Sequence, residues 1–172
     1  MPGRNFQRVV MKETKQTVSF TEFDNAAELP AELRELLQKA KSAVANAYAP
    51  YSQFRVGAAV LLENGEVVTG SNQENASSPA GICAERVALS AASSMNPGVG
   101  IRSIAISAKA DGYEVAEPVA PCGICRQTIL EYEYRFGKNI EIVLQGDRGK
   151  ILRIATVKEL LPLNFSRDNL KR

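Results

Sequence analysis

Two stretches, Cys83-Ala84-Glu85-Arg86 and Pro121-Cys122-Gly123-Ile124-Cys125-Arg126-Gln127, hold every cysteine of a chain that contains no histidine. The second stretch has the C-x-x-C spacing with which one turn of a chain can chelate one ion. The first adds a third thiol from a separate element, with an acid two residues further on. Three soft ligands gathered around a single acid require a chemical explanation.

A zinc site is that explanation. Zn²⁺ takes thiolate ligands, and a catalytic site uses three protein ligands and leaves the fourth position for water. The chain has no histidine and no fourth cysteine to close a structural site, so Cys83, Cys122 and Cys125 predict an open, catalytic one. Zinc lowers the pKa of the water that it binds to about 7. Glu85 is then placed to carry a proton from that water to a substrate.

A plainer alternative treats Cys122 and Cys125 as a redox pair or as small buried residues, and Glu85 as a surface acid. It leaves Cys83 and Pro121 without a role. Zinc deaminases carry a His-or-Cys-x-Glu stretch followed by Pro-Cys-x-x-Cys, and their glutamate moves protons without binding the metal. The sequence has the three-cysteine version of this pattern.

Further motifs occur in a fixed order along the chain. They are Ala47 to Ala59, Gly70 to Ala76, Gly81 to Arg86, Pro121 to Gln127, and Leu160-Leu161-Pro162. Together they resemble the small homotetrameric zinc-dependent cytidine deaminases, from about residue 30 to the C-terminus. The resemblance implies a single catalytic domain over residues 28–172, preceded by an N-terminal extension over residues 1–27.

The resemblance also implies site roles for several residues. Phe54 packs against the pyrimidine ring, although it is also a plausible core residue. Asn72 and Glu74, which alternation places on one face of an extended chain, bind ribose hydroxyls; alternatively, they are solvated loop residues. The backbone of Ala84 orients the substrate amino group, and Phe165, otherwise a simple packing residue, reaches an active site of the tetramer.

Three thiolates around Zn²⁺ leave a net charge of −1, which an adjacent arginine can offset. Arg86 and Arg126 are both adjacent to a ligand, and the resemblance favours Arg86. At Ser78 the resembling enzymes often carry a tyrosine that reaches a neighbouring subunit's ribose. Serine is too small for that reach, so we expect a looser sugar pocket.

The hydrophobic pattern predicts an α/β fold: a three-layer α/β/α sandwich around a mixed sheet of about five strands. Pro30 suits the first turn of the first helix, with Asp24 or Asn25 as its cap, and Pro50 is expected to end it. Asn64-Gly65 predicts a hairpin turn, and a strand is possible over Val9–Phe23. The expected helices are 29–49, 83–95, 122–136 and 157–161, and the expected strands are 54–63, 66–71, 101–109, 140–144 and 150–156.

The whole chain sets broader limits. Its 172 residues, 45% hydrophobic and 23% charged, fit one globular domain. A net charge of +2 gives no footprint for nucleic acid, and no stretch approaches the ~20 apolar residues of a membrane span. Arg4, Arg8 and Lys12 precede no apolar run, so no secretory signal is expected. Free thiols used as ligands fit a cytoplasmic location.

The sequence therefore predicts a zinc hydrolase of pyrimidine salvage that converts cytidine and deoxycytidine to uridine and deoxyuridine with release of ammonia. Hydroxide attacks C4, and Glu85 then protonates N3 and the leaving amine. Three alternatives stay open. One is a deaminase of a modified cytosine nucleoside, N4-substituted or blasticidin-type, and another is a nucleic-acid deaminase. The third is a non-enzymatic zinc-binding structural module.

Overall fold

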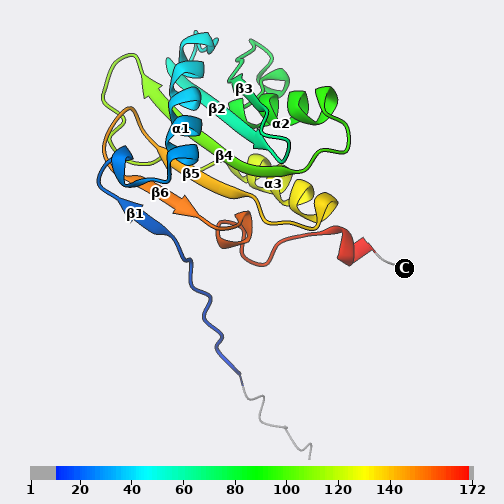
Figure 1. Ribbon diagram of the computed structural model, residues 1–172. Coiled ribbons are helices and arrows are strands. Elements are labelled where there is room, and N and C mark those ends of the chain that lie inside the picture. Colours follow the sequence, from blue (N-terminus) through cyan, green and yellow to red (C-terminus); the bar gives the residue numbers. More distant parts are fainter. Residues whose placement is uncertain (1–10, 171–172) are drawn as a thin grey trace, which may run out of the picture.

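The computed structural model describes residues 11–170 and contains one six-stranded sheet (Figure 1). The strand order is β1-β6-β5-β4-β2-β3, and every neighbouring pair is antiparallel except β4 and β5. The strands are β1 (Thr21–Phe23), β2 (Phe54–Leu62), β3 (Val67–Ser71), β4 (Ile101–Ala110), β5 (Glu141–Gln145) and β6 (Ile151–Ile154). The α-helices are α1 (Ala31–Ala43), α2 (Ala84–Met95) and α3 (Gly123–Phe136).

The two faces of the sheet carry different helices, and the alternation of β2 shows how. Ala58, Val60 and Leu62 join a core with the buried faces of α2 and α3. Ala59 and Leu61, which point the other way, join a second core with α1. Figure 1 shows α1 lying across one face, with α2 and α3 behind the sheet. The three-layer α/β/α architecture predicted from the sequence is confirmed.

The first helix differs from its prediction at both ends. It spans Ala31–Ala43 and continues as a short 3-10 turn to Asn46, so it ends well before Pro50. Asn25 does cap a helix, but that helix is the 3-10 turn Ala26–Glu28, whose Ala27 N–H donates to the Asn25 side chain. The N-cap of α1 is Pro30 itself. A helix was therefore predicted correctly in this region, but its boundaries were wrong.

The sheet has six strands where about five were expected, because part of the N-terminal extension adds one. β1 pairs with β6, with Thr21 opposite Arg153, and an ion pair joins Glu22 to Lys150. The strand predicted over Val9–Phe23 is thus confirmed only for its last three residues. Residues 11–20 are outside any helix or strand, and Val9 and Val10 lie outside the described residues.

The other elements lie close to their predicted positions. Gly65 closes the β2–β3 hairpin with a φ of 86°, a left-handed value that glycine adopts without strain. The predicted helix over 157–161 is a 3-10 turn, η4 (Val157–Glu159), and a second one, η5 (Arg167–Leu170), follows. Across residues 11–170, no helix combines the length and apolar character needed to cross a bilayer.

Candidate active site

All three cysteines meet where two helices begin. Cys83 is the N-cap of α2, Cys122 is the N-cap of α3, and Cys125 lies in the first turn of α3. The three sulfur atoms lie within 4.8 Å of one another. The Sγ atoms of Cys83 and Cys122 are 3.8 Å apart, and those of Cys122 and Cys125 are 3.5 Å apart.

These distances fit a tetrahedral metal. Four ligands at a Zn–S distance of about 2.3 Å place neighbouring sulfurs roughly 3.8 Å apart. Helix N-termini also favour thiolates, through their dipole and their unpaired N–H groups. The cluster therefore has both the geometry and the ligand chemistry for a zinc ion with three protein ligands.

The pKa values of Cys83 and Cys125 are shifted in opposite directions. The pKa of Cys83 is lowered to about 6, mainly by the hydrogen bond with the Cys125 side chain and least by the positive charge of Arg86, while burial and the charge of Glu85 oppose the shift. The same contact, together with burial, raises the pKa of Cys125. A lowered pKa at Cys83 favours the thiolate form, which is the form that binds a metal.

Glu85 lies in the first turn of α2, two residues past Cys83, and only 4% of its surface is exposed. Burial raises the pKa of this carboxyl group, and hydrogen bonds from its own backbone N–H and from Cys125 oppose that rise in part. A carboxyl group with a raised pKa beside a metal site can both accept and return a proton.

The two arginines have different surroundings. Arg126 donates from Nε to the backbone oxygen of Pro121 and from Nη1 to that of Leu160, both at 2.7 Å. Its guanidinium group therefore ties the start of α3 to the C-terminal segment. The charge of Arg86 makes a small contribution to the lowered pKa of Cys83, and its charge-offsetting role at a metal stays a prediction.

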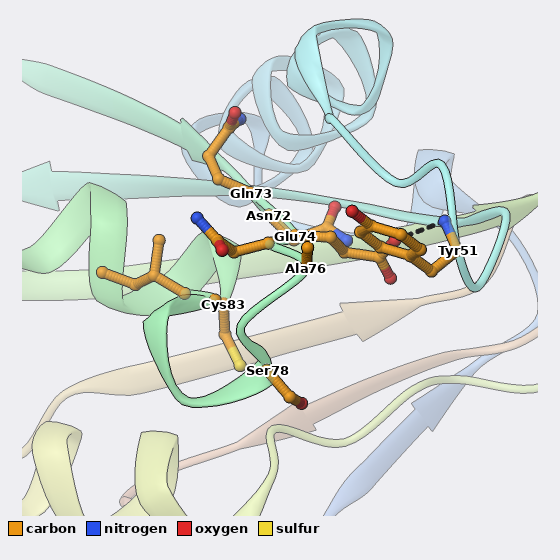
Figure 2. Close-up of a pocket in the computed structure, with 10 residues that line it drawn as sticks. Tyr51, Asn72, Gln73, Glu74, Ala76, Ser78 and Cys83 are labelled. Atoms are coloured by element: carbon orange, nitrogen blue, oxygen red, sulfur yellow. Dashed lines mark hydrogen bonds between the residues drawn. The ribbon is translucent and has the colours of Figure 1, made fainter.

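A pocket of about 420 Å³ opens beside Cys83 (Figure 2). Asn72 and Glu74, which follow β3, both line it, as does Ser78 in the 3-10 turn Ser78–Ala80. The full lining is Tyr51, Asn72, Gln73, Glu74, Asn75, Ala76, Ser78, Gly81, Ile82 and Cys83. The structure thus places the predicted sugar-binding pair and one predicted metal ligand around the same space.

Three predicted substrate residues are not part of that lining. Ala84, the first residue of α2, is fully buried. Phe54 is half-buried and packs with Ala108, Ala110 and Val115. Phe165 is 58% exposed on the C-terminal segment.

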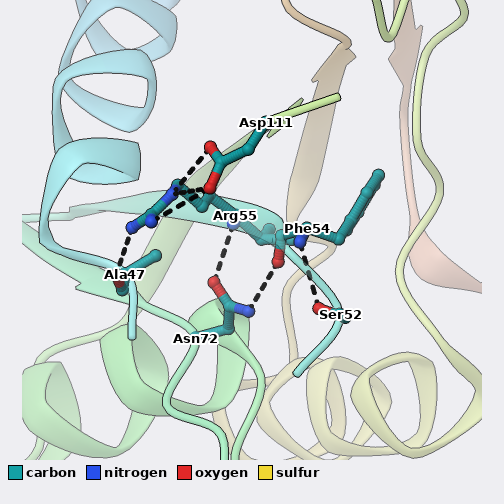
Figure 3. Close-up of polar contacts among 7 residues, drawn as sticks. Ala47, Ser52, Phe54, Arg55, Asn72 and Asp111 are labelled. Atoms are coloured by element: carbon teal, nitrogen blue, oxygen red, sulfur yellow. Dashed lines mark hydrogen bonds and ion pairs between the residues drawn. The ribbon is translucent and has the colours of Figure 1, made fainter. Parts of the chain in front are cut away.

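Asn72 and Glu74 also bind the protein itself (Figures 2 and 3). Asn72 donates from Nδ2 to the backbone oxygen of Phe54 at 3.0 Å, and its Oδ1 accepts from the N–H of Val56 at 2.7 Å. Glu74 Oε2 accepts from the N–H groups of Tyr51 at 2.9 Å and Ser52 at 3.2 Å. Hydrogen bonds from the Ser52 hydroxyl and from these N–H groups lower the pKa of Glu74.

These hydrogen bonds of Asn72 and Glu74 to β2 and to the turn before it were not predicted from the sequence. Residues 50–53 form a turn between α1 and β2, and the N–H groups of such a turn need acceptors. The need for acceptors could have pointed to Asn72 and Glu74, because they belong to the nearest polar motif in the hairpin. Gln127 was missed too: its Nε2 donates to the Phe165 backbone oxygen at 2.9 Å, and no local pattern pointed to that contact.

Helices that begin at a three-thiol cluster, with a buried carboxyl group and a polar pocket beside it, define the class of zinc deaminases. Residues 30–137 match the family model described as the cytidine and deoxycytidylate deaminase zinc-binding region. The chain belongs to this zinc-dependent family.

Individual relatives agree with the family match. The chain is 43% identical to a cytidine deaminase of Halalkalibacterium halodurans over 136 residues, which is 78% of this chain and 95% of the relative. It is 38% identical to one of Sporosarcina psychrophila over 140 residues, 81% and 95% of the two chains. Among solved structures, the cytidine deaminase of Burkholderia pseudomallei is similar with a TM-score of 0.65 and 39% identity, covering 76% of this chain and 97% of that one.

Proposed function

We propose that this protein is a cytidine deaminase, which hydrolyses cytidine and deoxycytidine to uridine and deoxyuridine with release of ammonia. The observation that carries the proposal is the arrangement of three cysteine sulfurs within 4.8 Å beside a buried Glu85 and a pocket lined by Asn72 and Glu74. Relatives up to 43% identical, named cytidine deaminases, support this substrate class.

The chain's own residues divide the work in this proposal. Cys83, Cys122 and Cys125 hold zinc, which when bound acts as a Lewis acid and makes water a nucleophile near neutral pH. Glu85 takes a proton from the attacking water and passes it to ring N3. It then takes the proton of the new C4 hydroxyl group and passes it to the amino group, which leaves as ammonia when the C4–N bond breaks. Arg86 offsets the negative charge of the thiolates. The backbone of Ala84, at the start of α2, orients the substrate amino group.

The substrate is held by the remaining residues. Glu74 and Asn72 accept from and donate to the sugar hydroxyls, since a carboxylate and a carboxamide together can satisfy both roles of a hydroxyl. Phe54 packs on the pyrimidine ring. We assign the reaction to pyrimidine salvage in the cytoplasm, where thiolate ligands stay reduced.

The test is the change in ultraviolet absorbance when cytidine becomes uridine, with bound zinc measured in each sample. Wild type should turn over cytidine, and Glu85→Gln should keep its zinc and lose at least about 10²-fold in kcat, the lower range for general acid–base catalysis. Glu35→Gln, an exposed change on α1, is the matched control. Turnover that survives in Glu85→Gln would reject Glu85 as the proton carrier.

A second candidate, a modified cytosine nucleoside as the substrate, follows from Ser78. This small, exposed residue lines the pocket at the position where a tyrosine is common in resembling enzymes. A zinc-loaded wild type that leaves cytidine unchanged but deaminates an N4-substituted cytidine would favour it. Ser78→Tyr should lower KM for cytidine and exclude larger analogues. Equal KM values for wild type and Ser78→Tyr would reject the looser pocket.

We also propose a homotetramer. The outward side of α3 forms an open groove of about 720 Å³, lined by Gly123, Ile124, Gln127, Thr128, Glu131, Tyr132 and Arg135. Ile124 is 63% exposed there, beside the helix start that carries Cys122. Sedimentation should give four chains for wild type and fewer for Ile124→Glu. Tyr113→Glu, an exposed change on the loop after β4, should stay assembled; a monomeric wild type would reject the tetramer.

A further inference from the structure

The main chain leaves the edge of β2 at Asn72. Backbone pairing of β2 with β3 ends at Gly57, and one more bond follows, from the Asn72 N–H to the Val56 oxygen at 3.1 Å. The Asn72 oxygen then accepts from the Tyr48 N–H at 3.0 Å, and the Glu74 N–H donates to the Tyr48 oxygen at 2.8 Å. The chain thus turns from β2 toward Tyr48 and carries Glu74 to the pocket.

The side chain of Asn72 continues the pairing that its main chain leaves (Figure 3). Its Oδ1 accepts from the Val56 N–H at 2.7 Å, and its Nδ2 donates to the Phe54 oxygen at 3.0 Å. A carboxamide carries a donor and an acceptor side by side, as a peptide group does. The Asn72 side chain therefore binds the start of β2 as the backbone of a neighbouring strand would.

Phe54 is held by side chains at both polar groups of its backbone. Its N–H donates to the Ser52 hydroxyl oxygen at 3.0 Å, and its oxygen accepts from Asn72. The residue before it, Gln53, has a φ of 55°, a left-handed value that is uncommon for residues other than glycine. Since Phe54 directly follows such a turn, its position depends on the bonds that fix the first residues of β2.

These two bonds use much of the hydrogen-bonding capacity of the Asn72 carboxamide. One of its two Nδ2 hydrogens goes to Phe54, and one of its two Oδ1 lone pairs accepts from Val56. One hydrogen and one lone pair remain. Asn72 also lines the pocket, so the remaining groups can serve the sugar contact while the others hold β2.

We infer that Asn72 is a positioning residue for Phe54, in addition to the sugar contact assigned to it. It fixes the residue that packs on the base relative to the segment that carries Glu74. The inference rests on the proposed function, because it takes Phe54 as the ring contact. A pure sugar contact matters only to a nucleoside with 2′ and 3′ hydroxyls, whereas a residue that positions Phe54 matters also to a nucleoside without them.

The experiment uses 2′,3′-dideoxycytidine, which has the base but lacks both of these hydroxyls. Its inhibition constant is measured in competition with cytidine, and bound zinc is measured in each sample. Asn72→Ala should raise this constant about fivefold, the scale of one aromatic contact. The kcat for cytidine should change little, since the cysteines and Glu85 lie at the starts of α2 and α3. In a Phe54→Ala background, Asn72→Ala should no longer change the inhibition constant.

Two further variants complete the test. Asn64 Oδ1 accepts from the Glu66 N–H at 3.0 Å in the turn at the other end of the hairpin, so Asn64→Ala is the matched control and should leave the inhibition constant unchanged. Asn72→Asp keeps the size of the side chain and an acceptor for Val56 but removes the donor to Phe54. It should act as Asn72→Ala does, and it replaces that variant if the alanine protein does not fold.

Two results would overturn the inference and leave the proposed function intact. One is an unchanged inhibition constant in the Asn72 variants, and the other is an equal rise in the Phe54→Ala background. A zinc-loaded wild type that does not deaminate cytidine would overturn both the inference and the proposed function.

Discussion

Two buried glutamates, Glu85 on α2 and Glu133 on α3, show at the scale of the residue how surroundings decide the use of a carboxyl group. Burial raises the pKa of Glu85, which lies next to the cysteine cluster. Glu133 is equally buried but accepts from the backbone N–H groups of Ile140 and Val157 and from the Thr156 hydroxyl. The proposed function uses Glu85 to move protons, whereas Glu133 joins α3 to Ile140, the residue before β5, and to the start of η4.

Glu133→Ala should therefore affect stability and not chemistry. It leaves the buried N–H groups of Ile140 and Val157 without their acceptor, and each such group costs about 1–3 kcal/mol. Urea denaturation should show a loss of at least about 2 kcal/mol. The kcat of the remaining folded protein, measured at low temperature, should equal that of wild type. A stable variant with a low kcat would contradict this division of roles.

A second residue pair makes stability depend on pH. Arg55 lowers the pKa of Asp111 through hydrogen bonds and charge, and it also donates to the Ala47 oxygen at 2.8 Å (Figure 3). Because the folded pKa lies below the ordinary 3.8, this stabilisation is complete above pH 3.8 and is lost as the pH falls through the folded value.

Asp111→Asn should be less stable than wild type at pH 7, and the difference should shrink as the pH falls below 3.8. The measurement is the midpoint of urea unfolding of both proteins between pH 7 and 3. A difference that stays constant over this range would show that the stabilisation does not come from the ionised Asp111 carboxylate.

At the scale of the element, two glycines fix how closely helices approach the sheet. A Cβ on Gly57 in β2 would lie 2.1 Å from the Ala40 oxygen of α1. A Cβ on Gly70 in β3 would lie 2.5 Å from the Ala88 nitrogen and 2.6 Å from the Ala84 oxygen of α2. All three distances lie below 3.0 Å, a separation that real Cβ atoms essentially never show, so a methyl group at either position must displace a helix.

Gly57→Ala and Gly70→Ala should each destabilise the fold by about 1–3 kcal/mol, the usual cost of overpacking. Only Gly70→Ala moves the helix that carries Glu85, so only this variant should also lose kcat in its folded, zinc-loaded fraction. The comparison needs unfolding curves and turnover at a temperature where both variants are folded. Equal kcat values would show that α2 can shift without consequence for Glu85.

Some helix boundaries could be predicted from the sequence, and others could not. The starts of α2 and α3, expected at residues 83 and 122, lie at Ala84 and Gly123, one residue further on. The end of α1 could not be predicted, since its last apolar residues continue the pattern into a 3-10 turn. The hydrogen bonds of Asn72 to Val56 and Phe54 join residues 16 and 18 positions apart through backbone groups, which side-chain patterns do not report.

At the scale of the whole molecule, β1 is the addition that the family pattern does not cover, because the family match begins at residue 30. β1 covers the outer edge of β6, and the Ser19 N–H reaches Glu159 Oε2 at 2.8 Å. An uncovered strand edge exposes unpaired N–H and C=O groups that can recruit other chains.

Removing residues 1–23 should therefore lower the thermal midpoint and increase aggregation on heating, while kcat for cytidine at 25 °C stays the same. Removing residues 1–18 keeps β1 and Ser19 and should match the full chain in both measurements. The readouts are differential scanning calorimetry and light scattering. Equal aggregation by the two truncated proteins would show that β1 does not protect the edge.

The separation of the two cores has a consequence for directed evolution. The proposed chemistry lies with α2, α3 and the pocket after β3, whereas α1 packs with its own cluster on the opposite face of the sheet. A mutant library confined to Leu33, Leu36, Leu37 and Ala40 would vary that second core with no direct contact to the site. Substitutions on the α1 side of the sheet can thus be selected for stability, and substitutions on the α2 and α3 side can be selected for new substrates.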